Sequence, residues 1–575
     1  MKGQEAINLW KLGDKKWNAW VKKNPDADID FSSTVFSDHV KNDVISFQHY
    51  TFPTGMVSFN DASFSGRVSF DDANFSGDAS FDNAKFTGVV SFDYAQFSGK
   101  EISFYGAEFN GKVISFKHTK FSENVSFCDA QFSGKNIDFS NVEFNGEDTS
   151  FDNIKFSGQV SFNSAKFSGN ISYGDANFSG EASFGNAKFS GEDTYFGNVR
   201  FNGRTTSFGK AQFSGKRAYF DCVEFNGEEA FFNSVDFNGE MISFQGTELN
   251  GKGYFTNSTF RGKHTSFSRV KFSGEVFFDN ARFSGEKANF DNGEFNGKTT
   301  SFDNAMFSGD IVSFRNTQFR GEIICFDNAE FEQSLSLQNA GFTDSIKVFS
   351  FRYSIFSKNL TLPILKLNCV LDLRNTKFNT QMMLHDLKCT LQTKTKRWRI
   401  IQFQIAADIE DISRLRRLKE ISESNKNHEG ALEFHADEMR AKRWHTSGRL
   451  ASILDLMFDK ISNYGQNILK SFFFLLFSNI CFSLLYFVMN MCMAFIHNPG
   501  CNVRTEGRFW DALDITFYNS IPFVPITRTI GAAGIENLFG DDIPNWFGIA
   551  ASSQGLISIV CLFLVGLGLR NRFRI

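Results

Sequence analysis

Cysteine is scarce in this sequence, and so is any excess of charge of one sign. The nine cysteines among 575 residues are scattered without paired spacing, so neither a zinc cluster nor a disulfide framework is expected. The formal net charge is only −4, which gives no basic signal for a nucleic-acid partner. These absences exclude disulfide-rich secreted domains and basic nucleic-acid-binding proteins.

Motifs for catalysis, for a cofactor and for secretion are also missing. The glycines do not form a strand-loop-helix phosphate loop, and pairs such as Ser-Gly and Lys-Phe recur so often that an apparent triad is expected by repetition alone. We therefore expect no enzyme activity, no cofactor and no metal. The opening residues 1–6 lead into a polar amphipathic stretch instead of an apolar secretory segment, which favours a cytoplasmic N-terminus.

Phenylalanine is abundant, with 74 residues in all. Along most of the chain it recurs at alternating gaps of about five and about six residues. A small or β-branched residue stands two positions before nearly every Phe, for example Ala84 before Phe86, and the residue between is polar. This alternation predicts short strands that bury the Phe and the residue two before it. The core ladder includes Phe59, Phe64, Phe70, Phe75, Phe81, Phe86, Phe92 and Phe97.

Turn-forming residues follow each of these phenylalanines. Ser65-Gly66 and Asp82-Asn83 are pairs that tolerate positive φ and make tight turns. A strand of about three residues cannot bury its own apolar face, so such strands must stack on copies of themselves. With four faces per turn, a coil takes roughly 22 to 24 residues, and the repeat makes about 15 or 16 coils over residues 29–392.

The repeated units also resemble a known family. Residues 165–169 read Ala-Lys-Phe-Ser-Gly and residues 73–77 read Ala-Asn-Phe-Ser-Gly. These units resemble the pentapeptide repeat, in which a small residue two before a central Phe or Leu recurs every five residues. The resemblance covers well over half of the chain and implies a mainly β protein, with a right-handed quadrilateral β-helix in a phenylalanine-rich variant.

The N-terminal end of such a β-helix must be covered. Apolar residues such as Leu9, Trp10 and Trp17 fall at helical spacing between Glu5 and Lys23, and Asn24-Pro25 would stop a helix. The sequence therefore predicts that residues 1–28 form one capping helix.

Residues 393–466 are predicted to form a cytoplasmic helical linker. Helical periodicity over 408–424 and 429–444, with a turn between, indicates an αα-hairpin. Its Leu-Arg-Arg-Leu-Lys and Ala-Leu-Glu-Phe-His segments resemble the linker of membrane-anchored pentapeptide-repeat proteins. His435 and Glu438 share one face, but without further chelating residues we expect a solvated surface there and no metal site.

Residues 467–575 carry two long apolar runs. Residues 468–496 are almost uncharged after Lys470, and residues 546–569 are entirely uncharged. Each run exceeds the roughly 20 residues that cross a bilayer. Basic residues flank the pair and place both termini in the cytoplasm. The sequence thus predicts a multi-pass protein of a bacterial inner membrane, with the lipid bilayer as one partner. The flanking residues are Arg440, Lys442, Arg443, Arg449, Lys460, Lys470, Arg570, Arg572 and Arg574.

Between the two runs, residues 507–521 are predicted to form a short amphipathic helix. The order of span, short helix, loop and span resembles two-helix cation channels, whose loop lines the pore. A Thr-Val-Gly-Tyr-Gly filter is missing, and residues 522–531 stand in its place. An interfacial helix is the structural alternative. The candidate pore-loop residues are Phe509, Trp510, Asp511, Asp514, Thr516, Asn519, Ser520, Pro522 and Pro525.

Three functions fit these features. The first is a membrane-anchored scaffold or sensor that binds an unidentified cytoplasmic protein through its polar β-helix. The second is an ion-channel-like effector, for which we expect a homo-oligomer through the membrane domain, because two helices cannot enclose a pore. The third is a DNA-mimicking protein that binds gyrase, as one branch of the family does. It is the weakest, because the acidic excess of the repeat is sparse.

Overall fold

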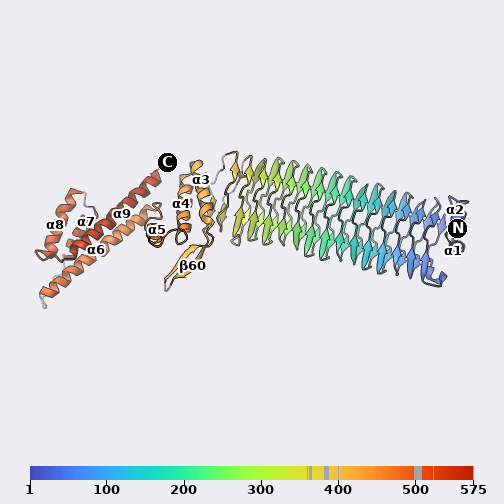
Figure 1. Ribbon diagram of the computed structural model, residues 1–575, viewed down its shortest axis with the longest axis horizontal. Helices are drawn as coiled ribbons and strands as arrows, with labels where there is room; N and C mark the ends of the chain where they lie inside the picture. Colours follow the sequence, from blue (N-terminus) through green and yellow to red (C-terminus); the bar gives the residue numbers. More distant parts are fainter. Residues whose placement is uncertain are drawn as a thin grey trace. The chain divides into compact units, whose positions relative to one another are not determined.

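The structure, a computed structural model, divides into two compact units, Met1–Thr390 and Leu391–Ile575. The first unit is a β-solenoid and the second is mainly helical (Figure 1). The residues that the structure describes are 1–358, 360–361, 365–380, 382, 387–398, 401–497, 508–521 and 524–573.

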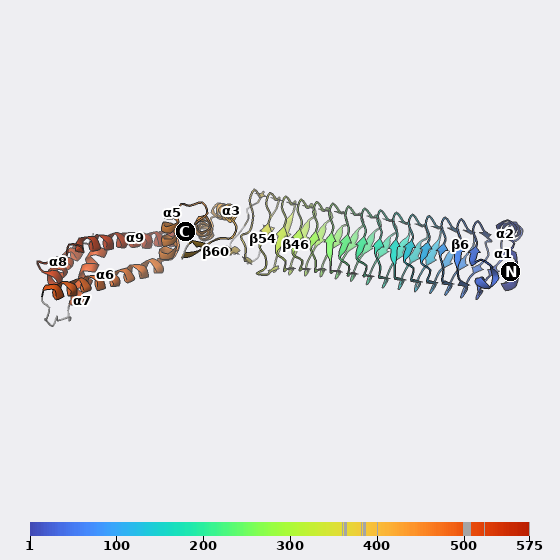
Figure 2. The ribbon, with the colours of Figure 1, turned by 60° about the horizontal axis from the view of Figure 1, so that its bottom comes forward.

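Among the residues that the structure describes, the solenoid has four parallel sheets of 15, 14, 15 and 13 strands. The strands of these sheets run from β1 (Ile29–Asp30) to β58 (Lys377–Phe378), and β57 (Leu365–Leu367) and β59 (Leu387–Cys389) form a separate parallel pair. Each strand pairs in parallel with the strand one coil away, and Figure 2 looks onto the sheet that contains β6 (Arg67–Ser69), β46 (Thr299–Ser301) and β54 (Val348–Ser350). The predicted quadrilateral β-helix is confirmed, with about 15 coils.

The core of the solenoid consists of stacked aromatic columns. Phe59, Phe81 and Phe104 form one column, with successive ring centroids 4.8 and 4.7 Å apart and ring planes within 8°. The neighbouring column meets it edge to face, since Phe92 lies 5.8 Å from Phe81 at 87°. Both geometries are favourable for aromatic rings. All eight phenylalanines of the predicted core ladder are fully buried.

The corners of the coils are of two kinds. In the Phe-Asp-Asn-Ala type, the N–H of Ala84 donates to the carbonyl of Phe81 over 3.0 Å, and Asn83 has a φ of 55°. Asn and Asp tolerate this left-handed conformation better than most residues.

The Ser-Gly corners need glycine for a different reason from the one the sequence suggested. Among these corner glycines, Gly66 has a positive φ, whereas the φ angles of Gly88 and Gly134 are not positive. A Cβ atom on Gly134 would lie 2.5 Å from the carbonyl oxygen of Gly111. Glycine is therefore required at Gly134 because the backbones of successive coils come too close for a side chain.

The N-terminal cap has two helices, so the prediction of one continuous helix was wrong. They are α1 (Gly3–Trp10) and α2 (Asp14–Val21), and Gly13 between them has a φ of 86° that breaks the helix. Trp17 is fully buried, stacks on Phe31 and donates its indole N–H to the carbonyl of Thr51. The two helices thus cover the first coil.

One outer ladder of the solenoid brings carboxylates together. Asp279, Asp303 and Asp327 occupy the same corner in successive coils, and the backbone N–H of Asp327 donates to Asp303 Oδ1 over 3.0 Å. At the neighbouring position Cys325 stands where the previous coil has Ser301, whose hydroxyl donates to Asp279. Burial raises the pKa of Asp303 to about 6, and the charges of Asp327 and Asp279 add to this effect.

The raised pKa of Asp303 makes the local stability depend on pH. The contribution of protonated Asp303 to the free energy of unfolding is fully present below about pH 4 and is lost as the pH rises through 6, because the folded state binds the proton more tightly than the unfolded state. The Asp303→Asn variant should lose this pH dependence. At pH 7 it should be more stable than the wild type by about 1 kcal/mol, after allowance for solvent screening. Asparagine fits such a corner, since Asn163 accepts the hydroxyl of Ser183 over 2.6 Å in another coil.

Hydrogen exchange of β46 (Thr299–Ser301) and β50 (Ile323–Cys325) in the full-length protein measures this effect, after correction for the intrinsic pH dependence of exchange. Equal slopes between pH 4 and pH 7 for the variant and the wild type would rule out Asp303 as the titrating group.

The second unit begins with a feature that the sequence reading missed. Strands β60 (Thr393–Trp398) and β61 (Ile401–Ala406) form an antiparallel hairpin, so the linker is not helical throughout. The αα-hairpin follows as α3 (Asp411–Ser424) and α4 (His428–Lys442). A further helix that was not predicted, α5 (Arg449–Ser462), comes before the first long apolar helix.

Four further helices follow in the described part of the chain. They are α6 (Ile468–His497), α7 (Arg508–Ser520), α8 (Pro525–Phe539) and α9 (Phe547–Phe573). Figure 1 shows α6 and α9 side by side, with α7 and α8 at one end of the pair.

Candidate functional site

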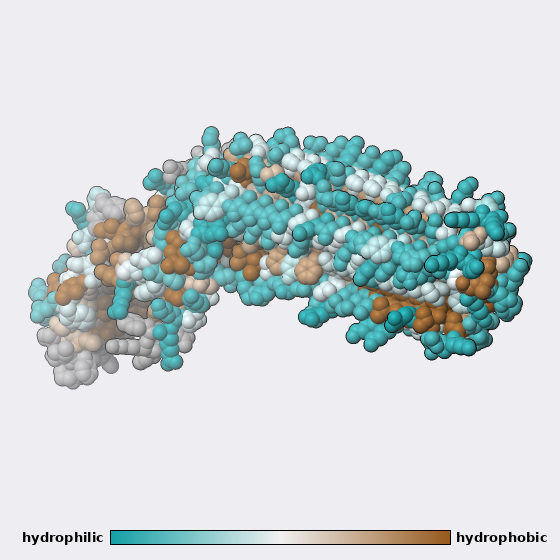
Figure 3. Space-filling view, turned by 45° about the vertical axis from the view of Figure 1, so that its right-hand side comes forward, coloured by the Kyte–Doolittle hydropathy of each residue, from teal (hydrophilic) through white to brown (hydrophobic). Residues whose placement is uncertain are grey.

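Helices α6 and α9 are long and apolar enough to cross a membrane, by length and composition. The segments Ile468–Ala494 and Phe547–Phe573 each have 27 residues, and their 18-residue apolar stretches have mean hydropathies of 2.1 and 2.0. Their apolar side chains are largely outward, as at Phe477 and Phe563, which are 64% and 68% exposed. The flank of the solenoid, by contrast, is mostly hydrophilic in the view of Figure 3. The outer surfaces of α6 and α9 thus suit a hydrocarbon environment.

Helix α7 packs closely against α8. A Cβ atom on Gly531 would lie 2.3 Å from Cβ of Tyr518, and one on Gly534 would lie 2.8 Å from the carbonyl oxygen of Asp511. Small residues of this kind let two helix backbones approach closely. The described part of the segment that takes the place of a channel filter is helical from Pro525 onward.

A buried polar network joins the C-terminal end of α7 to α6 and α9. Gln554 of α9 is fully buried, and its Nε2 donates to Asn479 Oδ1 of α6 over 3.2 Å and to the carbonyl of Thr516 over 3.0 Å. Gln554 Oε1 accepts from Tyr486 Oη over 2.9 Å and from Asn519 Nδ2 over 3.1 Å. One side chain thus links three helices.

Serine hydroxyls extend the network on both sides of Gln554. Ser520 donates to Asn479 Oδ1 over 2.6 Å, Ser558 donates to Ser520 over 3.3 Å, and Ser483 and Thr516 lie 3.0 Å apart. Buried polar groups that satisfy one another in this way fix the rotation and register of helices.

The network lies near the middle of the long helices. Asn479 is the twelfth of 30 residues in α6, and Ser558 is the twelfth of 27 in α9. The other end of α7 is near the C-terminal part of α6, where Arg508 Nη1 donates to Asn490 Oδ1 over 2.6 Å. Helix α7 therefore runs from one end of the helix pair to its middle.

The predicted pore-loop residues divide into three groups. Thr516, Asn519 and Ser520 belong to the buried network. Asp511 accepts a hydrogen bond from Asn537 of α8 over 3.0 Å, and the half-buried Asp514 packs near Gly534.

The remaining predicted residues lie outside the network. Trp510 is 70% exposed, and Phe509 meets Phe487 of α6 edge to face at 6.4 Å. Pro525 is the exposed first residue of α8, and Pro522 lies outside the described residues.

Sequence reasoning missed the partners on the long helices. Asn479, Ser483 and Tyr486 follow one another at intervals of four and three residues, and Gln554 and Ser558 are four apart. Such spacing places polar residues on one face of an otherwise apolar helix. That interruption of the apolar runs was the available signal, because polar residues in spans usually face the bundle interior.

The αα-hairpin carries ion pairs at the position considered for a metal. Glu438 is buried and pairs with Arg416 over 3.1 Å and with Lys442 over 2.7 Å. His435 Nδ1 lies 3.9 Å from Glu438. Within the described part of the chain, no three His, Cys, Asp or Glu side chains gather in a way that would hold a metal ion.

Comparison with known proteins agrees with the geometry of the solenoid. Residues 70–114 and 139–188 match the family model described as "Pentapeptide repeats (9 copies)". No curated protein and no solved structure matches the chain. The matched segments lie within the solenoid whose stacked Phe columns and four sheets continue on both sides of them. The chain therefore contains a solenoid of pentapeptide repeats in a phenylalanine-rich form, followed by two long apolar helices near its C-terminus.

Proposed function

We propose that this chain is a membrane-anchored pentapeptide-repeat protein whose solenoid serves as an interaction scaffold or sensor. The surface of the solenoid supports this role. Lys166 and Lys120 lie 2.7 and 3.5 Å from the carboxylate of Glu143 between them, and Lys85 lies 3.4 Å from Glu108. A repeated polar surface of this kind suits an unidentified protein partner in the cytoplasm. Because charges of opposite sign alternate along it, it does not favour DNA mimicry.

The anchoring part of the proposal rests on the exposed apolar surfaces of α6 and α9. We place the protein in a bacterial inner membrane, as a multi-pass protein with both termini in the cytoplasm. Full-length protein expressed in bacteria should stay in the membrane pellet after an alkaline carbonate wash. In inverted vesicles a protease should digest the solenoid without detergent. Release of the protein by carbonate would contradict the anchoring.

A second candidate function, an ion-channel-like effector, is favoured by the polar network around Gln554. A helix that enters to mid-depth and ends on buried polar groups is the arrangement in which a pore loop is held in channels. Because one chain offers only two long apolar helices among its described residues, a pore would need several copies, so this function implies a homo-oligomer.

Conductance of the full-length protein in planar bilayers tests the second function. We expect discrete currents from the wild type and a loss of about tenfold or more in Gln554→Leu, since unpaired buried partners each cost about 1–3 kcal/mol. Ser553→Leu is the matched control, because Ser553 is the exposed neighbour of Gln554 in α9. If the well-folded, inserted wild type carries no current, the channel function is excluded and the membrane-anchored scaffold remains. Equal currents from wild type and Gln554→Leu would exclude the network from the pore.

A further inference from the structure

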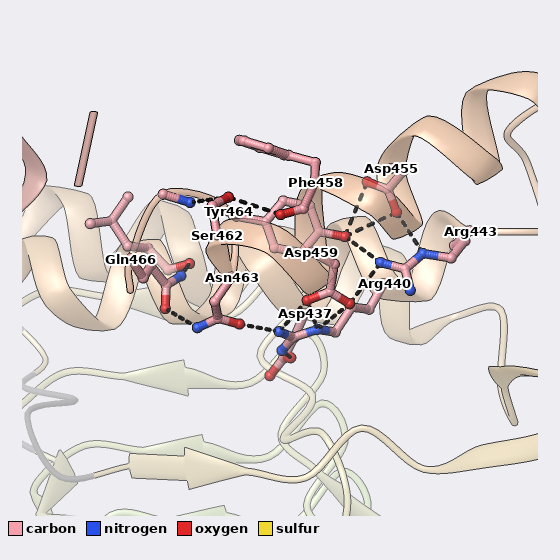
Figure 4. Close-up of polar contacts among 12 residues, drawn as sticks. Asp437, Arg440, Arg443, Asp455, Phe458, Asp459, Ser462, Asn463, Tyr464 and Gln466 are labelled. Carbon is pink, nitrogen blue, oxygen red and sulfur yellow. Dashed lines mark hydrogen bonds and ion pairs between the residues drawn. The ribbon is translucent and has the colours of Figure 1, made fainter. Parts of the chain in front are cut away.

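Helix α5 is held along one face by two arginines of the preceding segment (Figure 4). Arg443 donates through Nε to Asp455 over 2.6 Å and through Nη2 to Asp459 over 2.9 Å. Arg440 donates through Nη2 to Asp459 over 2.8 Å and through Nη1 to Asp437 over 2.7 Å. Charge-assisted pairs of this kind fix geometry as well as adding energy.

This cluster is largely shielded from water. The side chains of Arg443, Asp455 and Asp459 are only 9%, 12% and 13% exposed. Tyr464 completes it, since its hydroxyl accepts from Arg443 Nη2 over 2.7 Å and donates to Asp455 over 2.9 Å. Although burial opposes the charge, the hydrogen bonds from Arg440 and Arg443 hold the pKa of Asp459 below its ordinary value. The rotation of α5 about its axis is thereby fixed.

The opposite face of α5 is an exposed apolar stripe. Leu450, Ile453, Leu454 and Met457 are 71%, 48%, 58% and 52% exposed. Their spacing of three, four and seven residues puts them in one line along the helix. Asp455 and Asp459 lie about half a helical turn away, so the ion-pair cluster directs the stripe outward.

The C-terminal end of α5 lies beside the ends of the two long apolar helices. Gly465, in the turn after α5, accepts a hydrogen bond from Asn571 at the end of α9 over 3.1 Å. Ser471, in the first turn of α6, donates to the carbonyl of Ile461 over 3.3 Å. In a membrane, the ends of spans mark the boundary between hydrocarbon and headgroups.

Basic residues surround the same place. Lys460 of α5, Lys470 of α6, and Arg570 and Arg572 of α9 lie near these helix ends. Each basic residue near an anionic membrane surface contributes about 1 kcal/mol of attraction. An exposed apolar stripe with basic neighbours, continuous with a candidate span, fits a lipid surface better than a protein partner.

We infer that α5 is an interfacial helix that lies in the membrane surface, with Leu450, Ile453, Leu454 and Met457 inserted among the lipids. The ion-pair cluster of Arg440 and Arg443 then joins the αα-hairpin to this embedded helix. The inference rests on the proposed membrane anchoring. It adds a third contact with the bilayer, one that lies along the surface and does not cross it.

The test places a fluorescent amino acid in the full-length protein, reconstituted into vesicles of phosphatidylcholine and phosphatidylglycerol. The probe replaces Leu454 in α5, Glu420 in α3 as the exposed polar control, or Phe477 in α6 as the membrane control. Lipids brominated near the headgroup should quench the probe at Leu454 at least about twofold more than at Glu420, because interfacial helices bury their apolar face by about 5–10 Å. Iodide in the water should quench the probe at Glu420 and spare that at Leu454.

Each outcome separates the inference from the anchoring. Quenching by brominated lipid at Phe477 but not at Leu454 would overturn the interfacial helix and leave the anchoring intact. Absence of quenching at both positions would overturn the anchoring as well. If neither brominated lipid nor iodide quenches the probe at Leu454, protein covers the stripe, either a second copy or another partner, and the inference fails.

Discussion

Replacing Phe189 with alanine is expected to destabilise the solenoid locally by about 3–5 kcal/mol. Phe189 is fully buried and stacks between Phe167 at 4.9 Å and Phe213 at 4.6 Å, with its plane within 5° of both. It also meets Phe196 of the next column edge to face at 6.0 Å. Alanine would remove the ring from all three contacts and leave a cavity that the rigid column cannot fill.

The loss should remain near the altered coil, because each coil of a solenoid contacts only its neighbours. Hydrogen exchange of the full-length Phe189→Ala protein should speed up in β23 (Lys166–Phe167), β27 (Lys188–Phe189) and β31 (Gln212–Phe213). Lys188→Ala is the matched control, since Lys188 is the exposed neighbour in the same strand. If the two variants exchange alike, the aromatic columns do not carry the stability of the solenoid.

The Gly134→Val variant is expected to lose about 3 kcal/mol by overpacking. The new Cβ would stand 2.5 Å from the carbonyl oxygen of Gly111 and 2.6 Å from Cδ1 of Ile114. The isoleucine side chain can move, but the carbonyl belongs to the backbone of the preceding coil, so the two coils must separate.

Gly209→Val provides the control for this effect. The nearest atom to a Cβ on Gly209 is Ser207 Oγ at 3.5 Å, which is an ordinary contact. Hydrogen exchange around Gly134 should rise strongly in the first variant and little around Gly209 in the second. Comparable protection in both would show that close approach of the backbones does not explain the Ser-Gly corners.

The solenoid was predictable because its information is local and repeated. The spacing of Phe, the small residue two before it and the corner pairs all act within about six residues, so one unit defines every other. The role of the corner glycines was not predictable in the same way. It depends on how close Gly134 comes to Gly111, and that distance exists only once the coils are stacked.

The cap was mispredicted because the apolar periodicity continues across the break. Trp10 and Trp17 both face the first coil, and their indole N–H groups donate hydrogen bonds to the carbonyl oxygens of Ser46 and Thr51. A single helix and two helices separated at Gly13 therefore give similar patterns. The hairpin of β60 and β61 did carry a local signal, the alternation of Thr and Lys from Thr393 to Lys396, which is typical of a strand.

The polar network of the membrane unit depends on contacts between residues far apart in the sequence. Gln554 and Asn479 are 75 positions apart, and Tyr486 is 68 positions from Gln554. Periodicity could mark each of them as inward-facing, but nothing in the sequence assigns one to the other. Likewise, the stripe of α5 was visible as helical spacing, whereas the arginines that fix its direction are recognised only from the fold.

The stacking of near-equivalent coils has a consequence for how this protein can change its length. Phe127 stacks on Phe151 and Phe151 on Tyr173, so successive coils take 24 and 22 residues and still keep one column in line. An in-frame duplication or deletion of one such stretch would change the solenoid by a single strand spacing, about 4.8 Å, and would leave both of its ends as they were. Recombination between repeats can therefore lengthen or shorten the solenoid by one coil at a time.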